Sequence, residues 1–359
     1  MSLYYFTISA KNDCHVRSMD VKDRIKNNWL SEYSIALPER LIYKEDFDGQ
    51  KELYNLEKSM LDLSSDYISD DYFGSFWTRQ LALMVLNINR MEGTLSAPSS
   101  VDSVMMKSIL NFIIPTDDTI IPCVKKWNSE GGRNSNDISC TIRQLYQCSQ
   151  AAIVLLKNNL NSTLSISLIL QIYKLMMENS YVISQSAYDN KEEKEMLSME
   201  FRTTEVSAGY YQFLPSTAVM KAMRELCVDY NASTNMHPVE LATSLFQQMI
   251  SIHPFRNGNG RLCRLFMCWS LMKSGFPFPF CLSTGHKKAR RHYLHAIQSG
   301  RKDDGNLGEL NAIAVLSMKR VINNFTYNLK LMVPHKEGKR FKGKKRKANT
   351  PLYEEDEKV

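Results

Sequence analysis

Hydrophobic residues recur at helical spacing along much of the chain. In residues 76–91, Leu81, Met84, Val85 and Ile88 follow one another at i, i+3, i+4 and i+7, which places them on one face of a helix. Such a face packs against a core, so this segment is predicted to be an amphipathic helix. Similar patterns predict helices at roughly 140–157, 164–178, 216–228, 237–252 and 261–274. We therefore predict a mainly α-helical protein.

Residues 201–215 break this helical pattern. Their sequence, FRTTEVSAGYYQFLP, places Thr, Val and Tyr around Ala208-Gly209 and ends at Pro215. Strand-favouring residues on both sides of a glycine turn predict a short β-hairpin before the next helix. Two other segments are polar and carry no strand or helix prediction: 128–137, which is predicted to be a loop, and 180–194.

The two ends of the chain differ from its middle. Residues 1–80 alternate charged and apolar positions with only weak helical patterning. Residues 336–347 carry eight basic residues and one acid, and residues 348–359 carry a net charge of −3, so the rest of the chain holds only +3 of the total +7. We expect three parts: an N-terminal helical extension of unknown role at 1–80, a main domain at 81–333, and a basic then acidic disordered tail at 334–359.

The basic tail has three interpretations. It is a solvated segment, a nuclear-import signal, or a site that binds nucleic acid or lipid. Only Phe341 and Tyr353 provide aromatic rings there, too few for a platform on which bases stack. Nucleic-acid binding is therefore the least favoured role.

Composition narrows the class of protein. With 43% hydrophobic residues the chain can bury a sizeable core, and no apolar run approaches the ~18 residues that span a bilayer. The N-terminus lacks the charge order of a signal peptide. The eight cysteines include no C-x-x-C pair, which favours reduced core thiols over a metal site. We expect a protein of the cytoplasm, the nucleus or both, without membrane contact.

The segment IHPFRNGNGRLCR, residues 252–264, carries the candidate chemistry. A predicted apolar helix brings His253 to its C-terminal end, and Gly258-Asn259-Gly260 form a turn with accessible backbone amides. The next helix is predicted to start at about Arg261, so its free N–H groups and positive dipole end point at the same place. Arg261 and Arg264 share a face of its first turn. This arrangement predicts a phosphate site with a base beside it.

The same segment resembles the motif of the Fic family, H-x-F-x-D/E-G-N-G-R-x-x-R. Around it, FRTTEV at 201–206 resembles the start of the family's flap hairpin, and residues 264–277 and His292-Tyr293 resemble two later helices. The resemblance spans roughly residues 80–330. The motif positions that match are His253, Phe255, Gly258, Asn259, Gly260, Arg261 and Arg264.

The resemblance implies transfer of AMP from ATP to a Ser, Thr or Tyr hydroxyl of a protein, with Mg²⁺ or Mn²⁺ as the metal ion. It also implies possible self-modification and a possible homodimer. It implies that His253 takes the hydroxyl proton and that Arg264 grips the terminal phosphate. Phe255 is implied to be structural, and Tyr293 to contact the nucleotide. The remaining implied contacts are phosphate binding by Gly258, Asn259, Gly260 and Arg261, and target docking by Thr203, Thr204, Glu205 and Val206.

The sequence departs from the family pattern at two positions. Asn257 replaces the acid that binds the metal, so we expect weaker metal binding and a functional but attenuated site. The segment from Ile88 to Gly93 resembles the family's inhibitory motif, but Ile88 replaces a Ser or Thr. We expect an inhibitory helix near 81–93 whose Glu92 pairs with Arg264; the alternative is a solvated Glu92 at a helix end capped by Gly93.

Three other functions compete with AMP transfer. The departures at Asn257 and Ile88 allow a catalytically weak, nucleotide-binding regulatory protein. Removal of AMP from a modified protein, with Glu92 orienting a water, is a second alternative. Nucleic-acid binding through the tail is a third and weaker one.

Overall fold

A computed structural model describes residues 29, 35–38, 41, 47–63, 70–92, 102–113, 138–185, 192–233, 235–283, 287–302 and 305–332. The expected tail at 334–359 and the loop expected at 128–137 lie outside these described residues, as does Gly93, the expected helix cap. No helix of the described ranges has both the length and the apolar character needed to cross a membrane.

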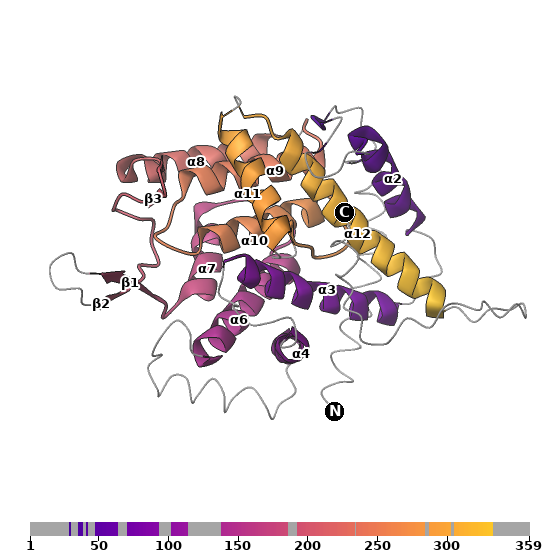
Figure 1. The fold of residues 1–359 in the computed structure, drawn as a ribbon, viewed down its shortest axis with the longest axis horizontal. Coiled ribbons are helices and arrows are strands. Elements are labelled where there is room, and N and C mark those ends of the chain that lie inside the picture. Colours follow the sequence, from indigo (N-terminus) through magenta and orange to yellow (C-terminus); the bar gives the residue numbers. More distant parts are fainter. Residues whose placement is uncertain are drawn as a thin grey trace, which may run out of the picture.

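The described chain is mostly helical (Figure 1). The helices of its first half are α2 (Gly49–Asp62), α3 (Asp70–Met91), α4 (Asp102–Ile113), α6 (Ile138–Ile153) with the π-helical turn η2 (Val154–Asn158), and α7 (Ile166–Met177). The helices of its second half are α8 (Ser216–Ala232), α9 (Pro238–Ile252), α10 (Asn259–Lys273), α11 (Lys287–Lys302) and α12 (Gly308–Met332). The predicted mainly α-helical class is confirmed.

Helix α10 runs through the middle of the molecule (Figure 1). It packs against α9, and its side chains are buried on every face, so it has no solvent-facing stripe. The start predicted at about Arg261 was two residues late, since the helix begins at Asn259. Gly258 adopts a left-handed φ of 77°, which lets the chain turn directly into the helix, and its carbonyl accepts a hydrogen bond from Leu262 N at 3.0 Å.

The hairpin predicted within 201–215 is present. Strands β3 (Ser207–Ala208) and β4 (Tyr211–Gln212) pair antiparallel around a two-residue turn. Gly209 opens that turn with φ 61°, a conformation that glycine adopts without strain. We call residues 203–214, which include this hairpin, the flap.

A second hairpin occupies the segment that the sequence left without an element. Strands β1 (Tyr181–Gln185) and β2 (Glu192–Met196) pair antiparallel and stand away from the helical body (Figure 1). Charged residues such as those of β2 are uncommon in strands, so residue preferences do not reveal it. Backbone pairing between the two strands overrides those preferences.

Described residues near the N-terminus pack onto the same core as the later helices. Trp29 is 1% exposed and donates from Nε1 to Ser274 O at 3.0 Å. Helix α2 lies along α12, with an ion pair between Glu52 and Lys319. The expected boundary near residue 80 stays a prediction; α3 runs across that position.

Candidate active site

His253 closes the C-terminal end of α9. It is the C-cap residue, with left-handed backbone angles φ 53° and ψ 61°, and its N–H donates to Met249 O at 3.0 Å. A non-glycine residue in this region is uncommon and is typical of functional sites. The chain then passes through a short loop and enters α10 at Asn259. The predicted helix–turn–helix arrangement around His253 is therefore present.

Two buried side chains hold the loop in shape. Asn259 is 2% exposed; its Oδ1 accepts from Phe255 N at 3.0 Å, and its Nδ2 donates to Phe255 O at 2.7 Å. The Phe255 ring is fully buried and stacks on Tyr173 with centroids 3.5 Å apart. These two side chains shape the loop, and the role of the Asn259 backbone amide in phosphate binding stays a prediction.

Asn257 is the exposed tip of the loop, and Gly258 beside it is buried. The Oδ1 of Asn257 accepts a hydrogen bond from Gly258 N at 2.6 Å. A Cβ at Gly258 would lie 2.8 Å from Sδ of Met177, so this position needs glycine for space as well as for its φ. In this conformation the Gly258 amide already donates to Asn257, and its predicted role in phosphate binding stays a prediction.

The two motif arginines are buried at the start of α10. Arg261 and Arg264 are 5% and 4% exposed. Arg261 donates from Nη1 to Oε1 of Gln144 at 3.3 Å, and Arg264 donates from Nη1 to the Tyr293 hydroxyl at 2.9 Å. Tyr293 is thus placed beside Arg264, and its predicted contact with a nucleotide is untested. Within the described residues, Nε of both arginines has no hydrogen-bond partner.

Glu92, the residue after α3, places its carboxylate at the N-terminal end of α10. Oε1 of Glu92 forms an ion pair with Nη2 of Arg264. A Cβ built on Gly260 would overlap the same Oε1, so the carboxylate lies directly against that glycine. The Glu92 side chain is 28% exposed. A carboxylate therefore occupies the position at which the sequence predicts a phosphate.

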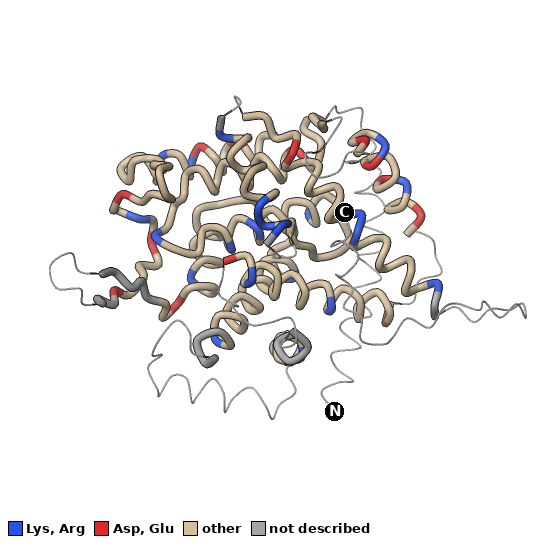
Figure 2. The backbone as a smooth tube through the Cα atoms, in the orientation of Figure 1, with Lys and Arg blue, Asp and Glu red and all other residues tan. Residues whose placement is uncertain are grey.

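Charges around Glu92 favour its ionised form. Burial alone raises the pKa of Glu92, but Arg264, Arg261 and Arg290 outweigh this effect, and the net pKa lies below its ordinary value. Arg290, on α11, also donates from Nε to Met91 O at 3.1 Å at the end of α3. Figure 2 shows Lys and Arg positions close together where α11 lies. These arginines hold the end of α3 against the site.

The imidazole of His253 is packed between backbone and flap. Its ring stacks on Phe213, with centroids 3.8 Å apart and planes 21° apart, and Nδ1 lies 3.3 Å from Ile250 O. With Nδ1–H donating to that carbonyl, Nε2 carries a free lone pair. Burial, helped by the charges of Arg301 and Arg202, lowers the pKa of His253 to about 4. The ring is therefore neutral at physiological pH.

The predicted docking residues of the flap are mostly exposed. Thr203 and Thr204 face solvent, and Val206 is half-buried and accepts from Phe213 N at 3.4 Å. Glu205 accepts from both the backbone N (2.9 Å) and Oγ (2.7 Å) of Ser216, so its carboxylate caps α8. Glu205 is already engaged within the chain, whereas the threonines are open to a partner.

The described residues supply few ligands for a divalent cation. No group of three or more His, Cys, Asp or Glu side chains in the described ranges is arranged to hold a metal ion. Asn257 offers one amide oxygen, which already accepts from Gly258. Mg²⁺ prefers one or two carboxylates together with substrate phosphates. The protein groups thus fit a phosphate better than a metal ion.

Sequence reasoning missed several residues that contact the site. Phe213 and Arg301 contact or face His253, and Gln144 contacts Arg261. They come from the flap, α11 and α6, and no local pattern links them to the motif. Arg202 lies within the FRTTEV segment, but the sequence predicts no role for its side chain.

Comparison with known proteins supports the resemblance. The Fic/DOC family model matches residues 163–271. A Fido domain-containing protein from Dictyostelium discoideum is 31% identical over 137 residues, which make up 36% of this chain and 93% of that protein. Protein adenylyltransferase Fic from Culex quinquefasciatus is 32% identical over 105 residues, or 28% of this chain and 20% of that protein. The chain thus matches about a fifth of the length of that adenylyltransferase.

Solved structures share the fold. Fic-1 from C. elegans superimposes with a TM-score of 0.54 at 16% identity, covering 77% of this chain and 72% of that one. A Fic domain containing signaling protein from Bacteroides thetaiotaomicron gives 0.53 at 17% identity, covering 78% and 96%. Together with the motif geometry and the relative from Dictyostelium discoideum, these likenesses lead to one conclusion. The chain belongs to the Fic/DOC family.

Proposed function

We propose that this site transfers AMP from ATP to a Ser, Thr or Tyr hydroxyl of a protein and releases pyrophosphate. One observation carries the proposal: a neutral, oriented His253 lies at the start of the loop that leads into the N-terminus of α10, where Arg261 and Arg264 are buried. Two relatives named protein adenylyltransferase are 32% identical to this chain over 105 and 109 residues, which supports the proposal.

His253 acts as the general base in this proposal. Nε2 accepts the proton of the target hydroxyl while that oxygen forms a bond to the α-phosphorus, and the bond from the α-phosphorus to the departing pyrophosphate breaks. Burial keeps the imidazole neutral, so it is ready to accept a proton. A positioned base of this kind typically contributes about 10²–10⁴-fold to the rate.

The start of α10 binds the phosphates. Free backbone N–H groups and the helix dipole favour an anion there, and Gly260 lets it approach the backbone closely. Arg261 and Arg264 provide donors for phosphate oxygens, including Nε atoms that have no partner among the described residues. Interactions with charge that develops during transfer lower the barrier.

Glu92 restrains the reaction. Its carboxylate occupies the anion site and pairs with Arg264, so the terminal phosphate of ATP competes with it for the same groups. Two anions cannot occupy one desolvated position at low cost. We infer an autoinhibited enzyme that acts slowly until α3 releases Glu92.

ATP enters with a divalent cation, Mg²⁺ or Mn²⁺, that the protein holds only weakly. The cation neutralises phosphate charge when bound. Asn257 would be the chain's own ligand, through an amide oxygen without negative charge. We therefore propose that the phosphates supply most of the ligands.

The flap docks the target protein. Thr203 and Thr204 are exposed, and the short strands β3 and β4 border them. An extended target segment pairs with this edge through backbone hydrogen bonds, which positions its hydroxyl without strong selection of neighbouring side chains. A second copy of the chain is one such target, which gives self-modification.

Two labels test the proposed reaction. The protein is incubated with a candidate target and with ATP labelled either on the α-phosphate or on the γ-phosphate. AMP transfer puts the α-label on protein and leaves the γ-label in pyrophosphate. A γ-label on protein, or no label with either substrate, contradicts the proposal.

Removal of AMP is the second candidate. It is favoured by the position of Glu92, whose carboxylate lies against Gly260 and whose charge acts on His253, where it would orient an attacking water. A pre-AMPylated target distinguishes the two reactions. Release of AMP by the wild type but not by Glu92→Gly supports removal as the main activity.

A further inference from the structure

Two arginines outside the Fic motif contact the backbone around His253. Arg202 precedes the flap in the chain, and Arg301 lies in the last turn of α11. The side chain of Arg202 is fully buried, and Arg301 is half-buried. Burying an arginine is costly unless its donors are satisfied, so the contacts of each indicate what it does.

Arg202 joins the motif loop to both ends of the flap. On the loop side, Nε donates to His253 O at 2.7 Å and Nη2 donates to Ile252 O at 3.3 Å. On the flap side, Nη1 donates to Thr204 O at 3.0 Å and Nη2 donates to Leu214 O. The backbone N of the same residue donates to Pro254 O at 2.9 Å. One side chain thus connects four carbonyl groups from two segments.

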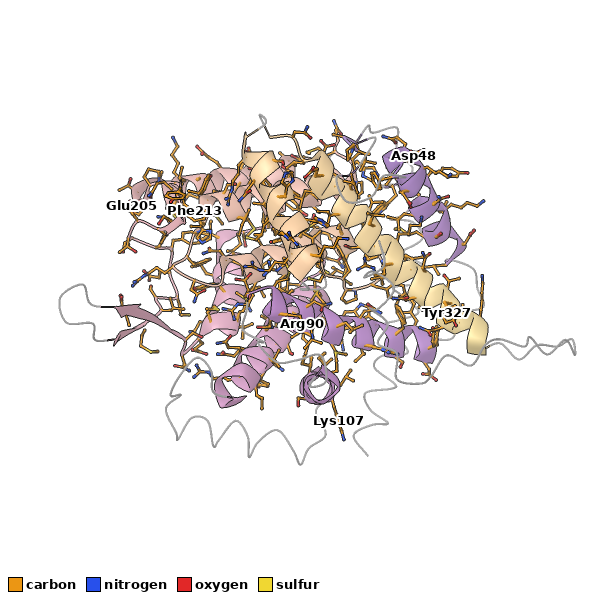
Figure 3. All side chains as sticks on the ribbon, viewed as in Figure 1. Asp48, Arg90, Lys107, Glu205, Phe213 and Tyr327 are labelled. Atoms are coloured by element: carbon orange, nitrogen blue, oxygen red, sulfur yellow. The ribbon has the colours of Figure 1, made fainter. Side chains whose placement is uncertain are left out.

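Arg301 contacts the same two segments from α11. Nη2 donates to Ile250 O at 3.3 Å, the carbonyl that also faces Nδ1 of His253. Its guanidinium lies over the rings of Tyr211 and Phe213, 4.1 and 5.3 Å from their centroids. Phe213 in turn stacks on His253. Figure 3 labels Phe213 near Glu205, on the flap side of the molecule.

We propose that Arg202 and Arg301 are positioning residues that couple the flap to His253, so that the imidazole is aligned for proton transfer only while the flap is seated. The inference rests on the proposed function in one respect, the role of His253 as base. Neither arginine acts on the substrate; each acts through the histidine and the flap. A target segment that holds the flap in this position therefore also keeps His253 aligned.

The charges that face His253 support this coupling. They are Arg301 from α11, Arg202 beside the flap, and Glu92 after α3. The two arginines lower the pKa of His253 in addition to the larger effect of burial, and Glu92 raises it. Removal of a positive charge makes protonation of the imidazole easier, so the loss of Arg301 should raise that pKa.

An imidazole titration by NMR tests the proposal on the full chain without nucleotide. The His253 resonance is assigned by its absence in His253→Ala. Arg301→Gln is expected to raise the His253 pKa by roughly one pH unit, while Arg301→Lys keeps the charge and stays closer to the wild type. Arg291→Gln removes an exposed charge from the same helix and serves as the matched control.

A kinetic measurement complements the titration. Arg301→Gln and Arg202→Lys are expected to lower kcat for a protein target by at least about tenfold, which is about 1.4 kcal/mol. Affinity for ATP should stay unchanged, because neither side chain contacts the start of α10. The Arg301 variants test the coupling between the flap and His253 even if Arg202→Lys does not fold.

The outcomes separate the inference from the proposed function. If Arg301→Gln titrates like the wild type, or if Arg291→Gln shifts the pKa equally, the coupling is overturned. A shifted titration with a normal kcat also overturns the coupling, and a shifted titration in a protein that transfers no AMP overturns the function alone. Normal transfer by Arg301→Gln with an unshifted pKa overturns the coupling alone.

Discussion

The carboxylate of Glu92 lies against the backbone of Gly260, in the first turn of α10. It reaches this place because α3 ends at Met91, the residue before Glu92, and because Arg264 forms an ion pair with the carboxylate. A phosphate bound at the same helix terminus would need the space that Glu92 fills. The proposed inhibition is therefore a competition between two anions for one site.

Replacement of Glu92 should release the site. We expect Glu92→Gly to raise self-AMPylation by roughly 5–150-fold, the usual range of coupling between two sites. Incorporation of α-labelled ATP over time measures the effect. Glu225→Gln, which changes an exposed carboxylate on α8, is the control and should leave the rate unchanged. An equal or lower rate in Glu92→Gly contradicts inhibition.

Gly260→Ala should act in the opposite direction although it also displaces Glu92. Its Cβ overlaps the carboxylate and would equally obstruct a phosphate, and it lies 3.3 Å from Nη2 of Arg264. We expect ATP to bind at least about tenfold more weakly than in the wild type. Calorimetric titration with ATP checks this. Binding as tight as in Glu92→Gly would show that phosphates lie elsewhere.

Asn257→Asp should restore a charged metal ligand. A carboxylate holds Mg²⁺ better than an amide, so the concentration of Mg²⁺ at half-maximal transfer should fall by about tenfold. The assay is best done in the Glu92→Gly background, where activity is higher. An unchanged dependence on Mg²⁺ would mean that position 257 does not contact the cation.

The pH dependence of transfer should reflect the buried imidazole. Burial disfavours the imidazolium, so His253 stays neutral well below its ordinary pKa of 6.5. In Glu92→Gly, kcat/KM should therefore hold steady as the pH falls through 6.5 and decline only toward pH about 4. A half-maximal rate near pH 6.5 would show that His253 is solvated in the working enzyme.

Phe255 should matter for stability more than for chemistry. Its ring is fully buried against Tyr173, so Phe255→Ala should cost about 3–5 kcal/mol of unfolding free energy. Urea unfolding followed by circular dichroism measures the loss. Tyr327→Ala on α12, where the ring is 58% exposed (Figure 3), should change stability by only about 0.5 kcal/mol. Equal losses in both variants would contradict the structural role.

Local patterns explain what the sequence could predict. The helices around His253 follow from apolar spacing, and the β3–β4 hairpin follows from strand-favouring residues around Gly209. The turn into α10 follows from Gly258. The predicted start of the helix is two residues late because Asn259 and Gly260 were expected to belong to the turn. Each of these features is decided within a few neighbouring residues.

Long-range contacts explain what the sequence could not predict. Phe213 stacks on His253 from 40 positions away, and Arg301 lies near both although it belongs to α11. Helix α10 shows no amphipathic stripe because it is surrounded on all sides. Strand β2 consists mostly of charged residues, so residue preferences do not reveal the β1–β2 hairpin. Only the packed chain brings these groups together.

His253 is the proposed general base of AMP transfer to a protein hydroxyl. The most direct test compares Glu92→Gly with the same variant carrying His253→Ala, each incubated with ATP and candidate target proteins and then analysed by mass spectrometry. We expect an added AMP mass on protein with Glu92→Gly and none when His253 is also replaced. Adducts of equal abundance in both, or no adduct in either, would contradict it.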